Sequence, residues 1–341
     1  MHNLTFNPIS VTKGFLRALE ERPRSIIIKR FGLQSAVPRT LESIGQEYGI
    51  TRERIRQIEA FSLNKLRQSE EFSSLAGIFD EITAGLDAMG TLVEQQYFLD
   101  SCAEHDGQKR HLLFLLVVGE PFERMKEDEE FRSCWTTDVN KANSIKKALS
   151  ALHREVNDKT LLPEKIILSS FGRYLEDNIG ENVSKEIVKA LLKVSRVLSP
   201  NALGDWGHAR SSYIRPRGMR DYAFLVMKKH GSPMHFLETA SAIQEFFNKP
   251  SHVQTVHNEL IKDDRFVLVG RGLYALKEWG YEGGVVRNVI EKILQKNGPL
   301  SKEEIIKKVL KERYVKENTI LVNLQNKKFF GKDAQGNYTL L

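Results

Sequence analysis

Residues 40–67, TLESIGQEYGITRERIRQIEAFSLNKLR, predict two short helices joined by a tight turn. Thr40 is suited to cap the first helix, in which apolar residues recur at helical spacing. Gly49 is suited to end that helix and form the turn, and Thr51 is suited to cap the second helix. Two helices joined in this way are typical of a helix-turn-helix, whose second helix enters the major groove of DNA.

The second predicted helix has two chemically different faces. Ile55, Ile58, Leu63 and Leu66 gather on one side, as expected of a helix that packs on a core. The other side carries charged and amide side chains: Arg52, Glu53, Arg54, Arg56 and Gln57. Glutamate and glutamine can bond to base edges, while arginine reaches phosphates or a guanine. A solvated helix on an ordinary core gives the same pattern, but the glycine turn and the compact spacing favour DNA.

Two stretches resemble the fourth conserved region of the bacterial sigma factor family. They are TRERIRQIE at 51–59 and ERPRSIIIKRFGL at 21–33, and the resemblance extends over residues 13–67. It implies a region that reads the upstream promoter hexamer of duplex DNA and that also docks on RNA polymerase. By the same resemblance, Arg52, Glu53 and Gln57 would read bases, and Arg54 and Arg56 would hold the DNA backbone. The expected DNA-contacting set is completed by Arg39 and Thr51.

The resemblance also bears on contacts with partner proteins. Phe61 and Asn64 stand where the family commonly has basic residues that activators use, so conventional activator contacts are not expected. Polymerase docking would use apolar residues around Leu16, Leu19 and Phe31, although these fit a core equally well. Few residues precede this region, and no domain for capturing a melted strand is recognisable elsewhere. The chain is therefore not expected to start transcription alone.

Charge is distributed unevenly along the 341 residues. The net charge is +7, but residues 1–67 carry 12 Lys and Arg against 6 Asp and Glu, and residues 283–341 carry the same numbers. Residues 68–215 carry 18 basic against 24 acidic side chains. Basic ends suit phosphate contacts, whereas an acidic middle suits protein contacts better.

The middle of the chain predicts mostly helices. The expected helices are 72–89, 92–103, 109–118, 139–156 and 184–198. Residues 131–135 and 205–214 read as short strands of one or two degenerate winged-helix units. Trp135 and Trp206, which lie in these stretches, are expected in the core.

The C-terminal part contains an internal repeat. Six positions recur at a common offset, as Thr255 does at Thr319. Each copy predicts three helices and a hairpin, the order of a winged helix. The expected helices are 221–229, 235–247 and 253–262, then 286–296, 302–311 and 317–325. The expected hairpins pair 266–269 with 273–276, and 329–331 with 338–340.

The first copy, residues 216–280, resembles the HARE-HTH winged-helix family, which occurs in the delta subunit of bacterial RNA polymerase. GSPMHFLETASAI and VHNELIKDDRFVLVGRGLYALKEWG carry the resemblance. Because the third helix and the wing of a winged helix contact DNA, the candidates in the first copy are Thr255, His257, Asn258 and Arg271. Those in the second copy are Lys316, Asn318, Thr319, Lys327 and Lys328. The first copy is nearly neutral, so a protein partner fits it as well as DNA does.

Together these patterns predict a mainly α protein. It would comprise an N-terminal helix-turn-helix domain (1–68), a helical middle region (69–215), a HARE-HTH-like winged helix (216–282) and a second winged-helix repeat (283–341), with small β-hairpin wings. No particular oligomeric state is predicted.

Patterns that would carry catalysis are not recognisable in the sequence. The two cysteines, Cys102 and Cys134, have no CxxC partner, and no HExxH, glycine-rich phosphate loop or G-x-S-x-G elbow occurs. We therefore expect no enzyme, cofactor, metal or membrane span. The expectation is a cytoplasmic, nucleoid-associated bacterial transcription factor that binds promoter-like double-stranded DNA and RNA polymerase. Two alternatives remain, a polymerase accessory subunit acting through protein contacts and a specificity or regulatory part of a restriction-modification system.

Overall fold

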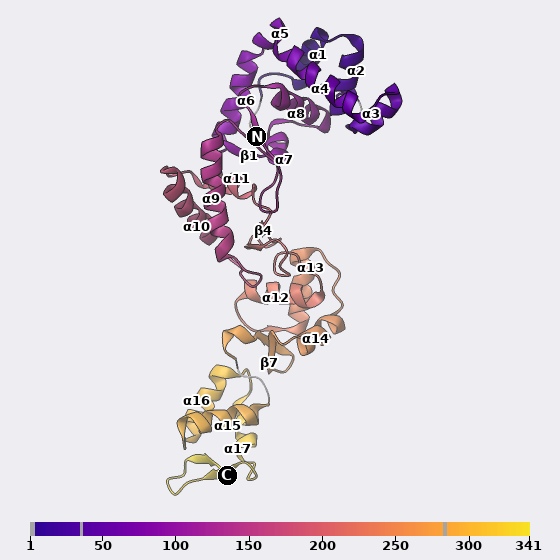
Figure 1. The fold of residues 1–341 in the computed structure, drawn as a ribbon. Coiled ribbons are helices and arrows are strands. Elements are labelled where there is room, and N and C mark those ends of the chain that lie inside the picture. Colours follow the sequence, from indigo (N-terminus) through magenta and orange to yellow (C-terminus); the bar gives the residue numbers. More distant parts are fainter. Residues whose placement is uncertain (1–3, 35–36, 282–284) are drawn as a thin grey trace. The chain divides into compact units, whose positions relative to one another are not determined.

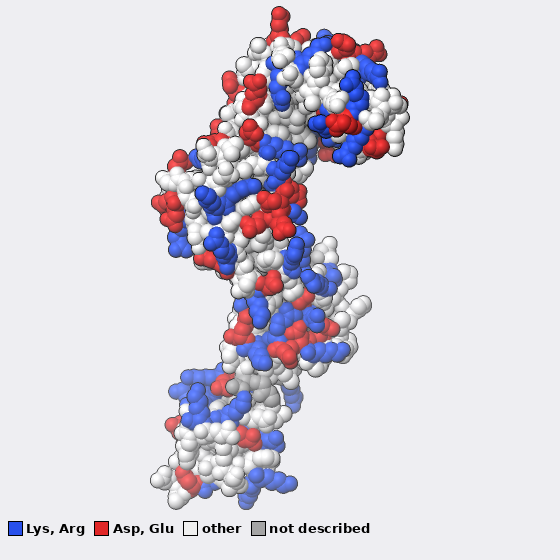
Figure 2. Space-filling model, viewed as in Figure 1, with Lys and Arg blue, Asp and Glu red and all other residues white. Residues whose placement is uncertain are grey.

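The computed structural model describes residues 4–34, 37–281 and 285–341. The chain divides into two compact units, Met1–Ser199 and Pro200–Leu341, and the described residues are mainly helical (Figure 1). Charged side chains cover much of the face shown in Figure 2, while the buried residues are mostly apolar. Within the described ranges, no helix combines the length and the apolar character that crossing a membrane requires.

The first unit begins with the helix-turn-helix and its supporting helices. These are α1 (Pro8–Phe15), the 3-10 turn η1 (Leu16–Ala18), α2 (Glu21–Phe31), α3 (Leu41–Tyr48) and α4 (Arg52–Arg67). The expected caps are present, because Thr40 Oγ1 accepts the Ser43 N–H and Thr51 Oγ1 accepts the Arg54 N–H, both at 3.1 Å. Gly49 ends α3 with a φ of 63°, a value that glycine adopts without strain.

The helix-turn-helix has a small core of its own. Ile26, Ile44 and Ile55 come from α2, α3 and α4 and are fully buried against one another. The approach of α3 to the following turn is close, because a Cβ on Gly45 would lie 2.6 Å from the carbonyl oxygen of Ile50. Glycine at this position lets the turn close, which holds α4 at a fixed angle to α3.

The rest of the first unit alternates helices with short strands. Its elements are α5 (Glu70–Ser73), α6 (Ala76–Ala88), β1 (Leu92–Glu94), α7 (Gln95–Cys102), α8 (Asp106–Val118), β2 (Glu123–Met125), β3 (Cys134–Thr136), α9 (Val139–Glu155), α10 (Glu164–Ile179) and α11 (Lys185–Leu192). The strand β4 (Leu198–Pro200) lies at the boundary, and its last residue is the first of the second unit. The strands β1, β3 and β2 form an antiparallel sheet in that order. Trp135 stands opposite Val93 on one side and Arg124 on the other.

Several predicted elements of the middle region are corrected by the structure. The helix expected at 72–89 is split into α5 and α6, and the one expected at 92–103 begins as strand β1, which pairs with β3. The helix expected at 184–198 ends at Leu192. The strand expected at 131–135 lies at Cys134–Thr136, and α10 was not predicted. Trp135 and Trp206 are buried, as expected.

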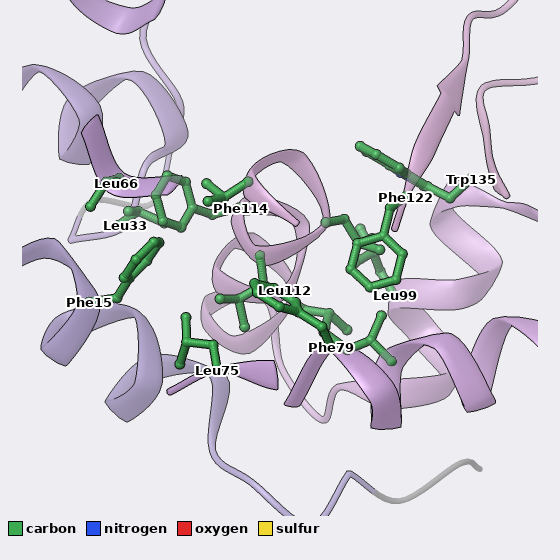
Figure 3. Close-up of a cluster of buried hydrophobic side chains, with 14 of the residues drawn as sticks. Phe15, Leu33, Leu66, Leu75, Phe79, Leu99, Leu112, Phe114, Phe122 and Trp135 are labelled. Carbon is green, nitrogen blue, oxygen red and sulfur yellow. The ribbon is translucent and has the colours of Figure 1, made fainter. Parts of the chain in front are cut away.

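The larger core of this unit joins the helix-turn-helix to the middle region. Figure 3 shows Phe15 of α1, Leu66 of α4 and Leu33, just after α2, beside Phe114 and Leu112 of α8. The core continues through Leu75, Phe79, Leu99, Phe122 and Trp135. Leu16 and Leu19 are buried in this core, and Phe31 is half-buried against Phe114. Of the two roles that the sequence left open for these residues, an exposed docking patch or a core, the structure shows the core.

Polar contacts reinforce this junction. Arg67 of α4 donates from Nε to the carbonyl of Val118 and from Nη2 to that of Val117, each at 2.9 Å. These are C-terminal carbonyls of α8 that have no partner within the helix. The ring of His111 lies 3.0 Å from the carbonyl oxygen of Leu33. The helix-turn-helix is therefore fixed to α8.

The second unit contains the two repeats. Its elements are β5 (Trp206–His208), α12 (Met219–His230), β6 (Met234–His235), α13 (Phe236–Phe247), α14 (Val253–Lys262), β7 (Phe266–Gly270), β8 (Leu273–Leu276), the 3-10 turn η2 (Lys277–Trp279), α15 (Val286–Asn297), α16 (Lys302–Glu312), α17 (Glu317–Leu324), β9 (Phe330–Lys332) and β10 (Tyr338–Leu340). The strand expected over 205–214 covers only Trp206–His208. Each repeat has three helices and a hairpin, within a few residues of the expected bounds.

The two repeats also share a strand pairing. In the first, Met234 of β6 pairs with Tyr274 of β8, and the sheet order is β6-β8-β7. In the second, Leu300 forms an isolated bridge with Tyr338 of β10, through backbone hydrogen bonds of 2.8 and 3.1 Å. Tyr274 and Tyr338 are equivalent positions of the sequence repeat. The order β1-β3-β2 in residues 76–136 follows the same pattern of helix, strand, two helices and two strands.

Candidate nucleic-acid interface

The exposed face of α4 carries the side chains that the sequence predicted there. Arg52, Glu53, Arg54, Arg56 and Gln57 are all exposed, and so is the capping residue Thr51. Ile55, in the same turn, is fully buried. The first turns of α4 therefore present a continuous polar surface directly after a capped helix N-terminus, where backbone N–H groups and the helix dipole favour negative charge.

The polar side chains of this face pair with one another across one helical turn. Arg56 donates to both carboxylate oxygens of Glu53, at 2.9 and 2.7 Å, and Nη1 of Arg54 donates to Oε1 of Gln57 at 3.1 Å. Arg56 holds the pKa of Glu53 below its usual range, so Glu53 is ionised at neutral pH. Because these pairs are exposed, they contribute little to stability and are readily exchanged for contacts with a ligand.

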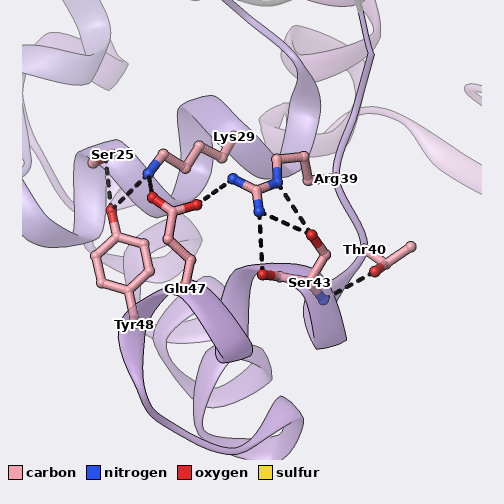
Figure 4. A network of polar contacts seen from close by, with 7 residues as sticks. All are labelled: Ser25, Lys29, Arg39, Thr40, Ser43, Glu47 and Tyr48. Atoms are coloured by element: carbon pink, nitrogen blue, oxygen red, sulfur yellow. Dashed lines mark hydrogen bonds and ion pairs between the residues drawn. The ribbon is translucent and has the colours of Figure 1, made fainter.

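A network of polar contacts joins α2, α3 and the residues just before α3 (Figure 4). Nη2 of Arg39 donates to Oγ of Ser43 at 2.9 Å and to its carbonyl oxygen at 3.2 Å, and Arg39 also pairs with Glu47. Glu47 accepts in addition from Lys29 of α2, and the hydroxyl of Tyr48 donates to Ser25 at 2.9 Å. Arg39, which was predicted to contact DNA, is thus engaged at the entry to α3. Sequence reasoning missed its partners, although Arg39, Ser43 and Glu47 recur every four residues.

This network makes stability depend on pH. Lys29 and then Arg39 hold the pKa of Glu47 below its ordinary value of 4.5. Glu47 therefore binds a proton less readily in the folded protein, and the stability it contributes is present above 4.5 and lost as pH falls through the lowered pKa. Melting temperatures of the wild type and Glu47→Gln should differ at neutral pH and converge in acid. Glu123→Gln, at an exposed glutamate of β2, is the control, and a constant difference between wild type and Glu47→Gln across the range would contradict this assignment.

The first repeat places its candidates in two different surroundings. Thr255 and Asn258 are exposed on α14, as a groove-facing helix requires. His257 is half-buried, with its ring stacked on that of Phe236 at 4.3 Å between centroids and 5.9 Å from that of Tyr274. The structure thus uses His257 in aromatic packing, an environment that the sequence pattern did not indicate.

The second repeat exposes all of its candidates. Lys316, Asn318 and Thr319 lie at the start of α17, and Lys327 and Lys328 precede β9. Arg271, from the hairpin turn of the first repeat, lines a cavity of about 760 Å³ together with Lys316 and Thr319. The backbone N–H of Tyr314 donates to the carbonyl of Val269 at 3.0 Å beside this cavity. Candidates chosen separately in the two repeats are therefore brought together.

One arrangement has the residue types of a hydrolase site. Nε2 of His153 lies 2.8 Å from Oγ of Ser195, and Nδ1 lies 3.5 Å from Oε2 of Glu130. Ser195 is only 1% exposed, and its Oγ accepts the backbone N–H groups of Val197 and Leu198 at 3.1 and 2.9 Å. The side chain therefore closes the turn after α11 and is shielded from any substrate.

The two cysteines are not activated as nucleophiles. Burial raises the pKa of the Cys102 thiol to about 11 and that of Cys134 to about 12, so both are protonated at neutral pH. Among residues 4–34, 37–281 and 285–341, no group of three His, Cys, Asp or Glu side chains is placed to hold a metal ion.

Comparison with known families bears on the N-terminal segment. Residues 15–68 match the family model described as Sigma-70, region 4. The match spans α2, α3 and α4 and hence the whole polar face described above. Region 4 is a DNA-binding helix-turn-helix region of sigma factors. Residues 15–68 of this protein are thus similar to sigma-70 region 4, which is consistent with a DNA-binding role related to transcription.

Proposed function

We propose that this protein is a non-catalytic transcription factor that recognises promoter-like duplex DNA through α4. The observation that carries the proposal is the exposed polar face of α4, which starts at a capped helix N-terminus inside the segment that matches sigma-70 region 4. A helix of this kind fits the major groove, where its N-terminal residues meet base edges. Its fixed connection to α8 holds the face in one orientation.

Individual roles follow from the chemistry of each side chain. Gln57 can donate and accept at once, which suits the N6 and N7 atoms of adenine, and Glu53 can accept from the amino group of cytosine. Arg52 in the first turn reaches a guanine, while Arg54 and Arg56 at the edges of the face reach phosphates. On binding, the Glu53–Arg56 and Arg54–Gln57 pairs are exchanged for contacts with DNA.

Titration of a duplex that carries the upstream promoter hexamer tests these roles. Arg52→Ala is expected to weaken binding by roughly 1–3 kcal/mol and to relax the base preference. Arg54→Ala is expected to weaken binding to all sequences alike and to reduce the salt slope by about one unit. Arg173→Ala, at an exposed arginine of α10, is the matched control and should bind as the wild type does. Unchanged binding in both α4 variants would show that this face is wrongly assigned.

The C-terminal repeats extend the proposal to RNA polymerase. We propose that residues 216–282 and 283–341 are winged helices, the first of the HARE-HTH kind that the sequence resembles, and that residues 76–136 are a further winged helix. The shared element order and the matching pairs Met234–Tyr274 and Leu300–Tyr338 support this assignment. Arg271, Lys316 and Thr319 would then contact nucleic acid or polymerase from one cavity rim.

A polymerase accessory subunit that acts mainly through protein contacts is the second candidate. The excess of six acidic side chains over residues 68–215 favours it. The burial of α8 favours it too. In the winged helix proposed for residues 76–136, α8 is the third helix, and because it is buried it cannot enter a groove of DNA. Capture of polymerase by the tagged chain after nuclease treatment, unaffected by Arg52→Ala, would favour this candidate, whereas capture that is lost with nuclease would favour DNA recognition.

A further inference from the structure

A basic groove lies along α9, outside the segment similar to sigma-70 region 4. Its volume is about 550 Å³, and it is lined by Asn143, Lys146, Lys147, Ser150 and Arg154. Counted from Asn143, the other four residues lie three, four, seven and eleven positions further along the chain. Residues at these spacings share one face of a helix. Figure 2 shows Lys and Arg side chains over α9, beside a group of acidic ones.

The opposite face of α9 explains why these side chains are held outward. Ala142, Ile145, Ala148, Leu149 and Leu152 are fully buried, so the helix cannot turn its polar face inward. A polar face opposite a core is usually only solvated. The polar face of α9 differs from an ordinary solvated face because acidic residues lie next to it.

Carboxylates from the preceding loop already rest against the groove. Oε2 of Glu130 accepts from Oγ of Ser150 at 2.7 Å, and Oδ2 of Asp128 lies 3.7 Å from Nζ of Lys146. Lys147 and Arg154, in contrast, have no carboxylate within 4.0 Å among the described residues. Ser150 and Lys146 therefore contact oxyanions of the protein itself, whereas Lys147 and Arg154 are cations available to a ligand.

We propose that this groove binds the phosphodiester backbone of duplex DNA without sequence preference. From Lys146 to Arg154 the helix rises about 12 Å, a length over which one DNA strand carries about three phosphates. Asn143, one turn before Lys147, adds a neutral donor. The proposal rests in part on the proposed function, because a DNA-bound helix-turn-helix keeps duplex near the same unit.

The net charge of the middle region does not oppose this contact. Charges separated by more than about 8–10 Å are largely screened at physiological salt. Glu127, next to the loop carboxylates, is paired with Arg196 at 2.9 Å. Lys146 is largely buried and paired with Asp128, so a phosphate in the groove meets mainly the exposed Lys147 and Arg154.

Binding of the full chain to a labelled random-sequence duplex tests the proposal, measured by fluorescence anisotropy over a series of salt concentrations. The double variant Lys147→Ala/Arg154→Ala is expected to weaken binding severalfold and to reduce the salt slope by about 1.8, since each phosphate contact adds ~0.9. Lys165→Ala/Lys185→Ala changes the net charge equally at exposed lysines of α10 and α11 and should leave the slope unchanged. Equal slopes in the wild type and the α9 variant, or equal losses in both double variants, would overturn the proposal.

Glu130→Gln gives an effect of opposite sign. Glutamine keeps an acceptor for Ser150 but removes a charge that competes with phosphate, so the random duplex should bind more tightly. Unchanged or weaker binding would contradict the competition. Polyglutamate and unlabelled DNA can be compared as competitors at equal charge. If polyglutamate displaces the labelled duplex equally well, the assignment to phosphodiesters is overturned.

The same series in the Arg52→Ala/Gln57→Ala background separates this inference from the proposed function. The α9 contact predicts the same loss of slope in that background, because it does not use α4. If the α4 variants keep full hexamer preference while the α9 effect persists, the proposed function fails and the groove stands. If hexamer preference is lost but the α9 slope is unchanged, the groove fails and the proposed function stands.

Discussion

Replacing Phe114 with alanine is expected to lower the free energy of unfolding by about 3–5 kcal/mol, the usual cost of removing a large aromatic side chain from a core. Phe114 is fully buried in α8, and its ring meets that of Phe31 edge to face, with 5.1 Å between centroids. Denaturant titration followed by circular dichroism and by tryptophan fluorescence would measure the loss, since Trp135 lies in the same core.

Phe114→Ala also tests whether α8 joins the helix-turn-helix to the middle region. Because one core contains Phe15, Leu66, Phe114 and Trp135, unfolding of the N-terminal helices and of the Trp135 surroundings should shift together. Phe61→Ala, which removes a 65% exposed ring from α4, is the control and should change stability by no more than about 0.5 kcal/mol. A loss below about 1 kcal/mol for Phe114→Ala, in the range of ordinary substitutions, would contradict the shared core.

Replacing Ile55 with alanine is expected to destabilise the helix-turn-helix by about 2–5 kcal/mol. Ile55 is fully buried between Ile26 and Ile44, in a cluster separate from the larger core. Hydrogen exchange should therefore speed up most in α3 and α4, while amides of α9 keep their protection. Binding to the hexamer duplex should fall as the population with an ordered α4 falls.

The conservative variant Ile55→Val gives the scale for this effect. It removes one methylene and should cost about 0.5–1.5 kcal/mol while leaving DNA recognition in place. If Ile55→Ala accelerated exchange in α9 as much as in α4, the separate cluster would not be a distinct stabilising unit. If it left both exchange and binding unchanged, the position of α4 on α2 and α3 would be wrong.

The sequence predicts helices best where caps and glycines mark their ends. Thr40, Gly49 and Thr51 delimit α3 and α4 as the structure has them. The prediction missed α10 because Ser169, Ser170 and Gly172 weaken its helix propensity, although Ile167, Phe171 and Leu175 are buried at a spacing of four. Strand β1 was read as helix because its pairing with β3, far along the chain, is not visible locally.

In the candidate site, too, contacts within one helix can be predicted from the sequence, whereas contacts between helices cannot. Exposure of Glu53 and Gln57 follows from helical periodicity alone, and so do their contacts with Arg56 and Arg54 within one turn. The contact of Lys29 with Glu47 depends on how α2 meets α3, which the sequence does not show.

The α9 groove was missed for another reason. The net charge of residues 68–215 averages the cations of α9 with acidic side chains elsewhere, so that Lys147 and Arg154 do not stand out. In the folded protein these two cations lie on one face of α9. The net charge of residues 68–215 therefore does not represent the charge of that face.

Selection of duplexes from a random pool by the full chain tests the central claim, that the exposed face of α4 reads bases. The wild type is predicted to enrich one short motif. The variant Arg52→Ala/Glu53→Ala/Gln57→Ala is predicted to keep weak, salt-sensitive binding and to enrich none. Enrichment of the same motif by both proteins, or of no motif by the wild type, would contradict the account.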